Sequence, residues 1–341
     1  MDEESELDRL LAEPERPPPS LKPAPGGWFG TALLLLFFVL PFLGWGLLPF
    51  LGLDDHRYTA ALVALTPCAV PVGVVLALLG LALRRWVMGL CVAVVTALLV
   101  VWVAPRAIPD SSADVPGHPL RVLSSNRYLG QGDAQQLVAL VRSERVDVLS
   151  LQELTPQQVR DLDRAGLGQV LAHRDFRPAA GGAGTGLASR YPLHPLGLMP
   201  PTTMRMPSDR LDLPGGRHVE VVAVHPQIPV GPETVPLWQR EIGMLPAPLG
   251  GSGAVPRVLA GDFNATLDHG PLRALLGRGY RDAAATTGNG LTPTWPMNTP
   301  GPPFAALDHV LAAEALGVGD WATFDLGGTD HRAVLAQVQV P

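Results

Sequence analysis

The chain has 341 residues, a formal net charge of −6, 47% hydrophobic residues and 16% charged residues. A chain of this length can hold a membrane segment together with one sizeable globular domain. The acidic balance argues against a protein that attracts nucleic acid through a strongly basic surface. Two cysteines, Cys68 and Cys91, are too few for a disulfide-rich scaffold.

Three long apolar runs, residues 29–53, 59–83 and 86–104, lie in the first third of the chain. Each is close to the ~20 residues that a helix needs to cross a bilayer, so residues 27–104 are predicted to form three transmembrane helices. Prolines within these runs are tolerated in membrane spans, where neighbouring groups bond the freed backbone. A cleavable signal peptide is an alternative for the first run, but its apolar part would be only ~7–15 residues long. A second alternative is that the three runs form buried core helices of a soluble domain, but such helices would need a much larger protein around them.

Basic residues near the run ends predict the orientation in the membrane. One side carries Arg9, Arg16, Lys22, Arg84 and Arg85, and the other side carries Arg57 and Arg106. The positive-inside rule places the first side in the cytoplasm. Residues 1–26, rich in Glu, Asp and Pro, are then a disordered cytoplasmic tail. With three spans, the chain is a multi-pass protein of the cell membrane whose remainder is extracytoplasmic: a linker at residues 105–119 and a domain at 120–341. Both cysteines fall in the predicted spans, so that domain has no disulfide.

From Leu120 onward, apolar runs alternate with amphipathic segments, which is typical of a sheet covered by helices. Strands are predicted at residues 121–125, 146–151, 187–191, 219–224, 257–261, 305–311 and 333–340, and helices at 133–145, 233–245 and 271–276. Asp133 and Gln136 have the spacing of a capping box. The glycine-rich segment 181–186 is interpreted as a turn, because no Lys-Ser/Thr pair follows as in a phosphate-binding loop.

Polar residues stand within or at the ends of six of these predicted strands. They are Asn126, Glu153, His225, Asp262 with Asn264, Asp308, and Asp330 with His331. Asp262 and Asn264 are two positions apart, so both side chains point to one side of an extended segment. A carboxylate and an amide in one cleft suit a reaction that orients a water molecule and stabilises an oxyanion. Taken singly, Asp262 and Asn264 are also typical of an ordinary turn at a strand end, and His225 of a structural histidine.

Together and in this order, the residues resemble the endonuclease/exonuclease/phosphatase superfamily of metal-dependent phosphoesterases, which includes DNase I-like nucleases. The matching motifs are SSN ending at Asn126, LQE at Glu153, GLASRYPL from Gly186, AVHP at His225, GDFN, TPTWP around Trp295, ALDHV at Asp308, and TDH ending at His331. They span residues 120–341. The apolar amino-terminal runs lie outside the resemblance and are similar to those of bacterial membrane-anchored members.

The resemblance implies a four-layer α/β sandwich of two mixed sheets between helices. It also implies a Mg²⁺ ion, with Mn²⁺ as a substitute, held by Glu153 with Asn126 and Asp330 nearby. Carboxylate and carbonyl oxygens suit these ions, and the sequence has no Cys or His cluster suited to zinc.

Among the catalytic roles that the resemblance implies, Asp262 would activate or orient the attacking water, helped by Asn264. His331, oriented by Asp308, would donate to a phosphate oxygen, and His225 would be a second donor or the acid for the leaving oxygen. The dipeptide Asp268-His269 is expected to be solvated surface.

The first expectation for function is an outward-facing, Mg²⁺-dependent phosphodiesterase. Endonuclease activity is the first expectation for the bond that it cleaves. After Ala104 the chain has 19 Arg against 22 Asp and Glu. This balance keeps open a phosphomonoesterase or a lipid-headgroup phosphodiesterase, similar to sphingomyelinases or inositol-phosphate phosphatases. A catalytically silent binding domain is a further alternative. The expected partners are a phosphate ester, from nucleic acid or a lipid headgroup, and the membrane itself.

Overall fold

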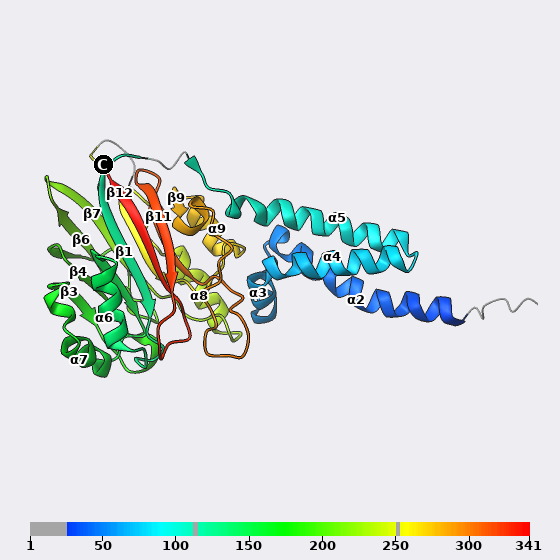
Figure 1. The fold of residues 1–341 in the computed structure, drawn as a ribbon, viewed down its shortest axis with the longest axis horizontal. Helices are drawn as coiled ribbons and strands as arrows, with labels where there is room; N and C mark the ends of the chain where they lie inside the picture. The colour runs from blue at the N-terminus through cyan, green and yellow to red at the C-terminus, as the bar shows by residue number, and fades with distance from the viewer. Residues whose placement is uncertain (1–25, 112–114, 250–252) are drawn as a thin grey trace, which may run out of the picture.

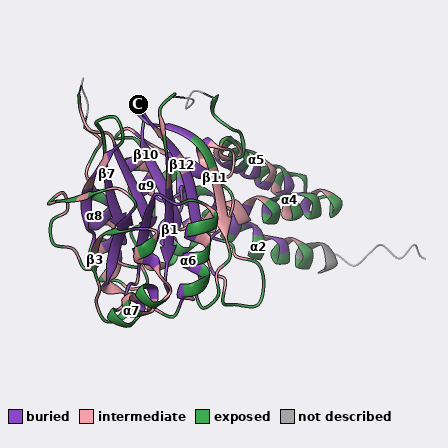
Figure 2. Ribbon diagram, turned by 60° about the vertical axis from the view of Figure 1, so that its left-hand side comes forward, coloured by how far each residue is buried: buried purple, intermediate pink, exposed green. Residues whose placement is uncertain are grey.

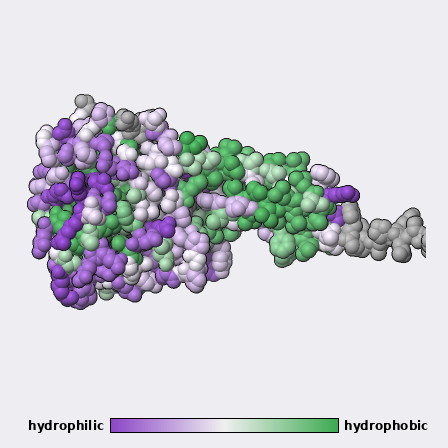
Figure 3. All heavy atoms as spheres, in the orientation of Figure 1, coloured by the Kyte–Doolittle hydropathy of each residue, from purple (hydrophilic) through white to green (hydrophobic). Residues whose placement is uncertain are grey.

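The computed structural model describes residues 26–111, 115–249 and 253–341. The expected amino-terminal tail lies outside these residues, apart from Gly26. An apolar helical bundle extends from one side of an α/β domain (Figure 1). Its exposed surface is dominated by hydrophobic residues, whereas the visible face of the domain is largely hydrophilic (Figure 3).

The bundle contains α2 (Gly26–Leu51), α3 (Arg57–Ala64), α4 (Thr66–Ala82) and α5 (Trp86–Val103). Two helices, over Gly30–Leu51 and Trp86–Ala107, are long and apolar enough to cross a membrane. The prediction of three continuous spans was therefore wrong. The second predicted span is broken into α3 and α4, which are bent by 74° and would form a third span only if counted together. Pro67, in the first turn of α4, explains the break because proline lacks the N–H that would extend α3 and restricts the residue before it.

Close packing joins α4 to α5 at their far end. A Cβ atom built on Gly80 would lie 2.9 Å from the Cα of Gly89, so the two helices approach to a distance that only glycine permits. Val39 and Phe42 of α2 pack with Val92 and Leu99 of α5 in the buried centre of the bundle. Their outward neighbours are exposed leucines, valines and phenylalanines, an arrangement suited to a lipid surround.

Two six-stranded mixed sheets form the α/β domain. The first has the order β11-β12-β1-β2-β4-β3 and the second β5-β6-β7-β8-β10-β9. The pairs β1–β2 and β7–β8 are parallel, and the other neighbours are antiparallel. The first sheet contains β1 (His118–Asn126), β2 (Val148–Gln152), β3 (His173–Arg177), β4 (Thr185–Ser189), β11 (Gly317–Phe324) and β12 (Ala333–Val340). The second contains β5 (Leu193–Leu196), β6 (Ser208–Leu213), β7 (Arg217–Val224), β8 (Arg257–Asp262), β9 (Tyr280–Asp282) and β10 (Asp308–Ala313).

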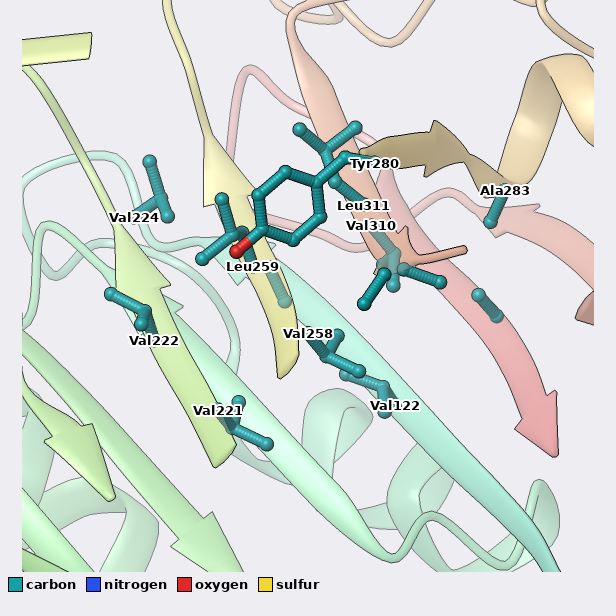
Figure 4. Packing of buried hydrophobic residues seen from close by; sticks show 14 of the residues in the cluster. Val122, Val221, Val222, Val224, Val258, Leu259, Tyr280, Ala283, Val310 and Leu311 are labelled. Atoms are coloured by element: carbon teal, nitrogen blue, oxygen red, sulfur yellow. The ribbon is translucent and has the colours of Figure 1, made fainter. Parts of the chain in front are cut away.

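The sheets pack face to face, and helices cover their outer faces, which confirms the expected four-layer sandwich. Val122 of β1 and Val258 of β8 meet in the core between the sheets (Figure 4). The helices α6 (Ala134–Ser143) and α7 (Pro156–Arg164) cover the first sheet, and α8 (Thr234–Gly243) and α9 (Gly270–Leu276) cover the second. Their outward faces are exposed while the strands are largely buried (Figure 2). Shorter elements are α10 (Ala283–Thr286) and the 3-10 turns Ala104–Ala107 (η1), Leu167–Gln169 (η3) and Gly181–Ala183 (η4).

Several details differ from the prediction. Asp133 caps α6 by accepting from the backbone N–H groups of Gln135 and Gln136. The reciprocal half of the capping box is absent, because Gln136 Oε1 accepts from the N–H of Gly327 instead. The strand predicted at residues 305–311 is displaced to Asp308–Ala313. Strands β3, β5, β6, β9 and β11 were not predicted, because polar residues, prolines and glycines interrupt their alternation of apolar and polar side chains.

Candidate active site

Strand ends of the two sheets meet at one edge of the sandwich and bring the expected residues together. The first sheet supplies Asn126 at the end of β1, Glu153 after β2, and Asp330 and His331 before β12. The second sheet supplies His225 after β7, Asp262 and Asn264 at β8, and Asp308 at the start of β10. A hydrogen bond of 3.0 Å from Asn126 Nδ2 to Asp262 Oδ2 bridges the two sheets. All eight residues that the sequence analysis selected therefore lie in one neighbourhood.

Asp262 occupies its position because β7 and β8 run unusually close together before it. A Cβ atom on Gly261 would lie 1.9 Å from the carbonyl oxygen of Val224, so only glycine fits there. The buried Asp262 carboxylate then accepts the backbone N–H of Asn264 at 2.8 Å. Asn264 has φ 49°, a left-handed conformation that asparagine adopts more readily than most residues, and its Nδ2 donates to the carbonyl of Pro226.

Asp308 and His331 form the expected hydrogen-bonded pair, with 2.8 Å between Asp308 Oδ2 and His331 Nδ1. In the β8–β10 ladder Asp308 is the direct partner of Asp262, which places the two carboxylates on either side of the imidazole. His331 Nε2 consequently lies 3.7 Å from Asp262 Oδ2. Because Nδ1 is bonded to Asp308, Nε2 is the ring nitrogen that can donate to a group bound in the site.

Burial and charge set opposite protonation states for the two histidines. Burial by itself lowers the pKa of His331, but the negative charges of Asp308 and Asp262 outweigh it and raise the pKa to about 10. Burial lowers the pKa of His225, and the charge of Asp262 only partly opposes this effect. At neutral pH His331 is therefore a cation and His225 is neutral. Burial also raises the pKa of Asp262, which makes this carboxylate a stronger base.

Glu153 has a left-handed backbone, with φ 55°. Its Oε2 accepts the N–H of Leu129 at 2.6 Å, and its Oε1 lies 3.3 Å from Asn126 Nδ2. Such a conformation costs on the order of 1–3 kcal/mol for a residue other than glycine, and strain of this kind concentrates at functional sites. The backbone therefore directs this carboxylate into the edge where the other acidic residues lie.

Two arrangements of oxygen and nitrogen atoms in the site could hold a metal ion. Asp330 Oδ1 is buried without a hydrogen-bond partner, and Glu153 and Asn126 lie on the same edge. Ligand atoms of Asp262, Asp308 and His331 also lie within 4.8 Å of one another. In the second set, Nδ1 of a cationic His331 is already committed to Asp308, and a protonated imidazole does not bind metal. The carboxylate and amide oxygens of the first set are the better match to Mg²⁺.

The sequence analysis missed two threonines that fix the site. Thr294 Oγ1 donates to Asp308 Oδ2 at 2.6 Å and accepts the N–H of Leu307. Thr329 Oγ1 donates to the carbonyl of Asn126 and accepts the N–H of His331, which ties the segment before β12 to the end of β1 in the first sheet. Both stand in motifs noticed in the sequence, TPTWP and TDH, but a hydroxyl gives no sign of its partner before the fold is known. Trp295 of the first motif donates Nε1 to Asp330 Oδ2 at 3.2 Å.

The expectation that Asp268-His269 is solvated surface was wrong. The side chains of Asp268 and His269 are buried, 0% and 2% exposed. They lie against the membrane bundle, where Asp268 pairs with Arg106 and His269 contacts the carbonyl of Ala60. Sequence inspection could not find these contacts, because the partners are 162 and 209 positions away.

Comparison with known proteins identifies the fold and the family. No match was found among curated protein sequences. An endonuclease/exonuclease/phosphatase structure from Beutenbergia cavernae shares 19% identity over 65% of this chain and 72% of that one, with a TM-score of 0.51, which shows a common fold. A mannosyl-6-phosphatase from Bacteroides thetaiotaomicron has 16% identity over 64% of this chain and 99% of that one, with a TM-score of 0.49. A humanized D. rerio TDP2 has 16% identity over 65% of this chain and 99% of that one, also with a TM-score of 0.49.

The profile of the Endonuclease/Exonuclease/phosphatase family matches residues 122–331, more than half of the chain. The matched segment contains every residue of the site. The chain therefore belongs to the endonuclease/exonuclease/phosphatase family of metal-dependent phosphoric ester hydrolases.

Proposed function

We propose that this protein is a membrane-anchored, divalent cation-dependent phosphodiesterase whose catalytic domain is extracytoplasmic. The observation that carries the proposal is the cationic His331, held between Asp308 and Asp262 of the second sheet and at the same edge of the sandwich as the Glu153 carboxylate. A fixed cation beside a base and a set of oxygen ligands suits hydrolysis at phosphorus, which depends on positioning and charge stabilisation.

In the proposed site, Glu153 and Asp330 would hold Mg²⁺, or Mn²⁺ as a substitute, together with Asn126. Asp330 Oδ1 supports this assignment, because it is buried without a hydrogen-bond partner and has only a 3.9 Å contact with His331 Nε2. For Asn126 to be a ligand its amide would have to turn, because Nδ2 now faces Glu153 and Asp262 while Oδ1 accepts the N–H of Tyr128. When bound, the cation would polarise the phosphate and neutralise the charge that develops on it.

The chain's own residues would then carry the proton transfers. Asp262, with its raised pKa, would accept a proton as the oxygen of a water molecule bonds to phosphorus and the P–O ester bond breaks, and the leaving oxygen would take up a proton from solvent water. Asn264 would hold the water, and His331 would donate from Nε2 to a non-bridging oxygen. The lowered pKa of His225 favours a neutral hydrogen-bond donor over an acid for the leaving oxygen.

A substrate panel tests this function. The full-length protein in detergent is incubated with Mg²⁺ and DNA, RNA, sphingomyelin, inositol phosphates or bis(p-nitrophenyl) phosphate, with Asp262→Asn as the inactive control. We expect diester cleavage by the wild type and not by the variant. A substrate affinity that falls steeply with salt would assign a polyanion and support the nuclease. If the folded protein cleaves no phosphate ester, the proposal fails. The two candidate substrates are a nucleic acid and a lipid-headgroup diester. The contacts between domain and bundle described below favour the lipid.

The outward orientation can be tested with reporter fusions. In the structure α2 runs toward the domain, α4 runs away from it and α5 returns (Figure 1). If the bent α3–α4 pair crosses, a fusion after Arg85 places a reporter in the cytoplasm and a fusion after Pro341 places it outside. A reporter that works only in the cytoplasm is expected to be active at position 85 and inactive at 341. The reverse result would contradict the outward orientation of the catalytic domain.

A further inference from the structure

A cluster of polar contacts fastens the α/β domain to the end of the membrane bundle. We name it the membrane latch and define it as Asp54, Ala60, Trp102 and Arg106 of the bundle with Asp268, His269 and Gly270 of the domain. Arg106 donates two hydrogen bonds to the Asp268 carboxylate, at 2.7 and 2.9 Å, and Trp102 Nε1 donates a third at 2.8 Å. Because Asp268 is fully buried in this contact, the pair can form in only one relative placement of bundle and domain.

The second half of the latch uses α3 and the chain before it. His269 accepts the N–H of Thr266 at Nδ1, so Nε2 carries the proton that is shared with the carbonyl of Ala60 at 3.0 Å. Asp54 accepts the N–H of Gly270 at 2.6 Å. Contacts from three separate segments of the bundle thus hold one turn of the domain, which fixes rotation as well as distance.

The same turn is continuous with the catalytic residues. Three residues separate Asn264 from Asp268 in the sequence. Trp238 of α8 donates Nε1 to the carbonyl of Phe263 at 3.3 Å, and its ring packs edge-on against His269 at 5.0 Å. His309 holds the carbonyl of Ala265 at 2.9 Å. The active-site edge therefore has a fixed position relative to the end of the bundle.

Apolar side chains are exposed on two loops that leave the active site. Ile228 and Val230, 43% and 62% exposed, lie between His225 and α8. α8 reaches the bundle, where Gln239 donates to the carbonyl of Asp54. Phe304, 43% exposed, packs on Trp295, which donates its Nε1 hydrogen bond to Asp330 in the site. Apolar loop tips next to membrane helices suit contact with lipid.

We infer that the membrane latch holds the active-site edge at the bilayer surface, so that the enzyme hydrolyses phosphate diesters in the headgroups of membrane lipids. This inference rests on the proposed phosphodiesterase function and names its substrate class. The Arg and acidic counts of the domain favour it over a nucleic-acid polymer, since 19 Arg face 22 Asp and Glu after Ala104.

The test compares membrane-bound and soluble substrates in the same preparation. Full-length protein is reconstituted into phosphatidylcholine vesicles that contain sphingomyelin and phosphatidylglycerol, and headgroup release is measured alongside turnover of soluble bis(p-nitrophenyl) phosphate. We expect Arg106→Gln to lower lipid hydrolysis about tenfold through misplacement of the site, while soluble turnover stays within about twofold. Arg106→Lys, which keeps the charge, should recover part of the loss. Asp163→Asn on α7, which breaks the surface pair with Arg174 of β3, is the matched control.

Each other outcome overturns a specific statement. An equal loss on both substrates would mean that the latch supports the catalytic turn or the fold and does not place the site at the bilayer. No loss on the lipids would mean that the latch has no role in their hydrolysis. If the wild type cleaves the soluble diester but none of the three lipids, the membrane-surface inference fails and the proposed phosphodiesterase stands. If it cleaves nothing, the proposed function itself fails.

Discussion

Replacing Glu153 by Gln is expected to remove most of the hydrolytic activity. The change keeps the size of the side chain and its contact with the N–H of Leu129, but it deletes the charge that would hold the cation. Loss of the bound cation should cost several kcal/mol of transition-state stabilisation. The measurement is turnover of a soluble diester by the full-length protein, with and without EDTA. Unchanged turnover in EDTA would contradict the cation-dependent mechanism.

A second measurement separates cation binding from catalysis. Saturating Mg²⁺ should raise the melting temperature of the wild type, because a ligand that binds only the folded state stabilises it by about 2.7 kcal/mol at a hundred times its Kd. Glu153→Gln should reduce this shift. Glu144→Gln is the matched control, since Glu144 is paired with Arg121 away from the site, and it should leave both turnover and the Mg²⁺ shift unchanged. An undiminished shift in Glu153→Gln would place the cation elsewhere.

Replacing Asp308 by Asn is expected to move the alkaline limb of the pH–rate profile to lower pH. The pKa of His331 is raised to about 10, so the imidazole is cationic below that pH and loses its proton above it. Asn keeps a group of the same size but withdraws a negative charge that raises this pKa, so the proton is lost at lower pH. Activity on the alkaline side should therefore suffer more than on the acidic side. His331→Asn should cost about 3 kcal/mol, as expected for a preorganised oxyanion donor.

The second sheet offers a matched control for this pair. His309 and Asp282 are also buried and lie 2.8 Å apart, and the Asp282 charge outweighs the effect of burial to raise the pKa of His309. Neither residue is among those of the active site, so Asp282→Asn should leave the alkaline limb in place. The double variant of Asp308 and His331 should be little worse than His331→Asn alone, because effects within one catalytic unit are strongly non-additive. Full additivity, or a limb that does not move, would show that Asp308 does not act through His331.

Local sequence patterns were sufficient to predict the fold class and to select the residues of the candidate site. The alternation of apolar runs and amphipathic segments predicted the covered sheets, and polar residues that follow apolar runs predicted the strand ends. Gly261 before Asp262 is an example: a glycine that ends a buried strand is a local signal, and the structure gives the reason in the close approach to Val224. The resemblance in the spacing of the motifs then predicted the layers of the sandwich.

Tertiary structure alone decided which groups meet. Asp308 faces Asp262 because β10 pairs with β8 in one register, and a shift by one residue would turn the side chain to the other face. Thr294 and Thr329 acquire their roles from partners in other elements. The polarity of Asp268 and His269 predicted a solvated surface loop. They are buried against the bundle instead, where Arg106 and Ala60 supply their hydrogen-bond partners. Sequence determines where a polar side chain can stand along the chain, but whether water or protein satisfies it depends on contacts between distant segments.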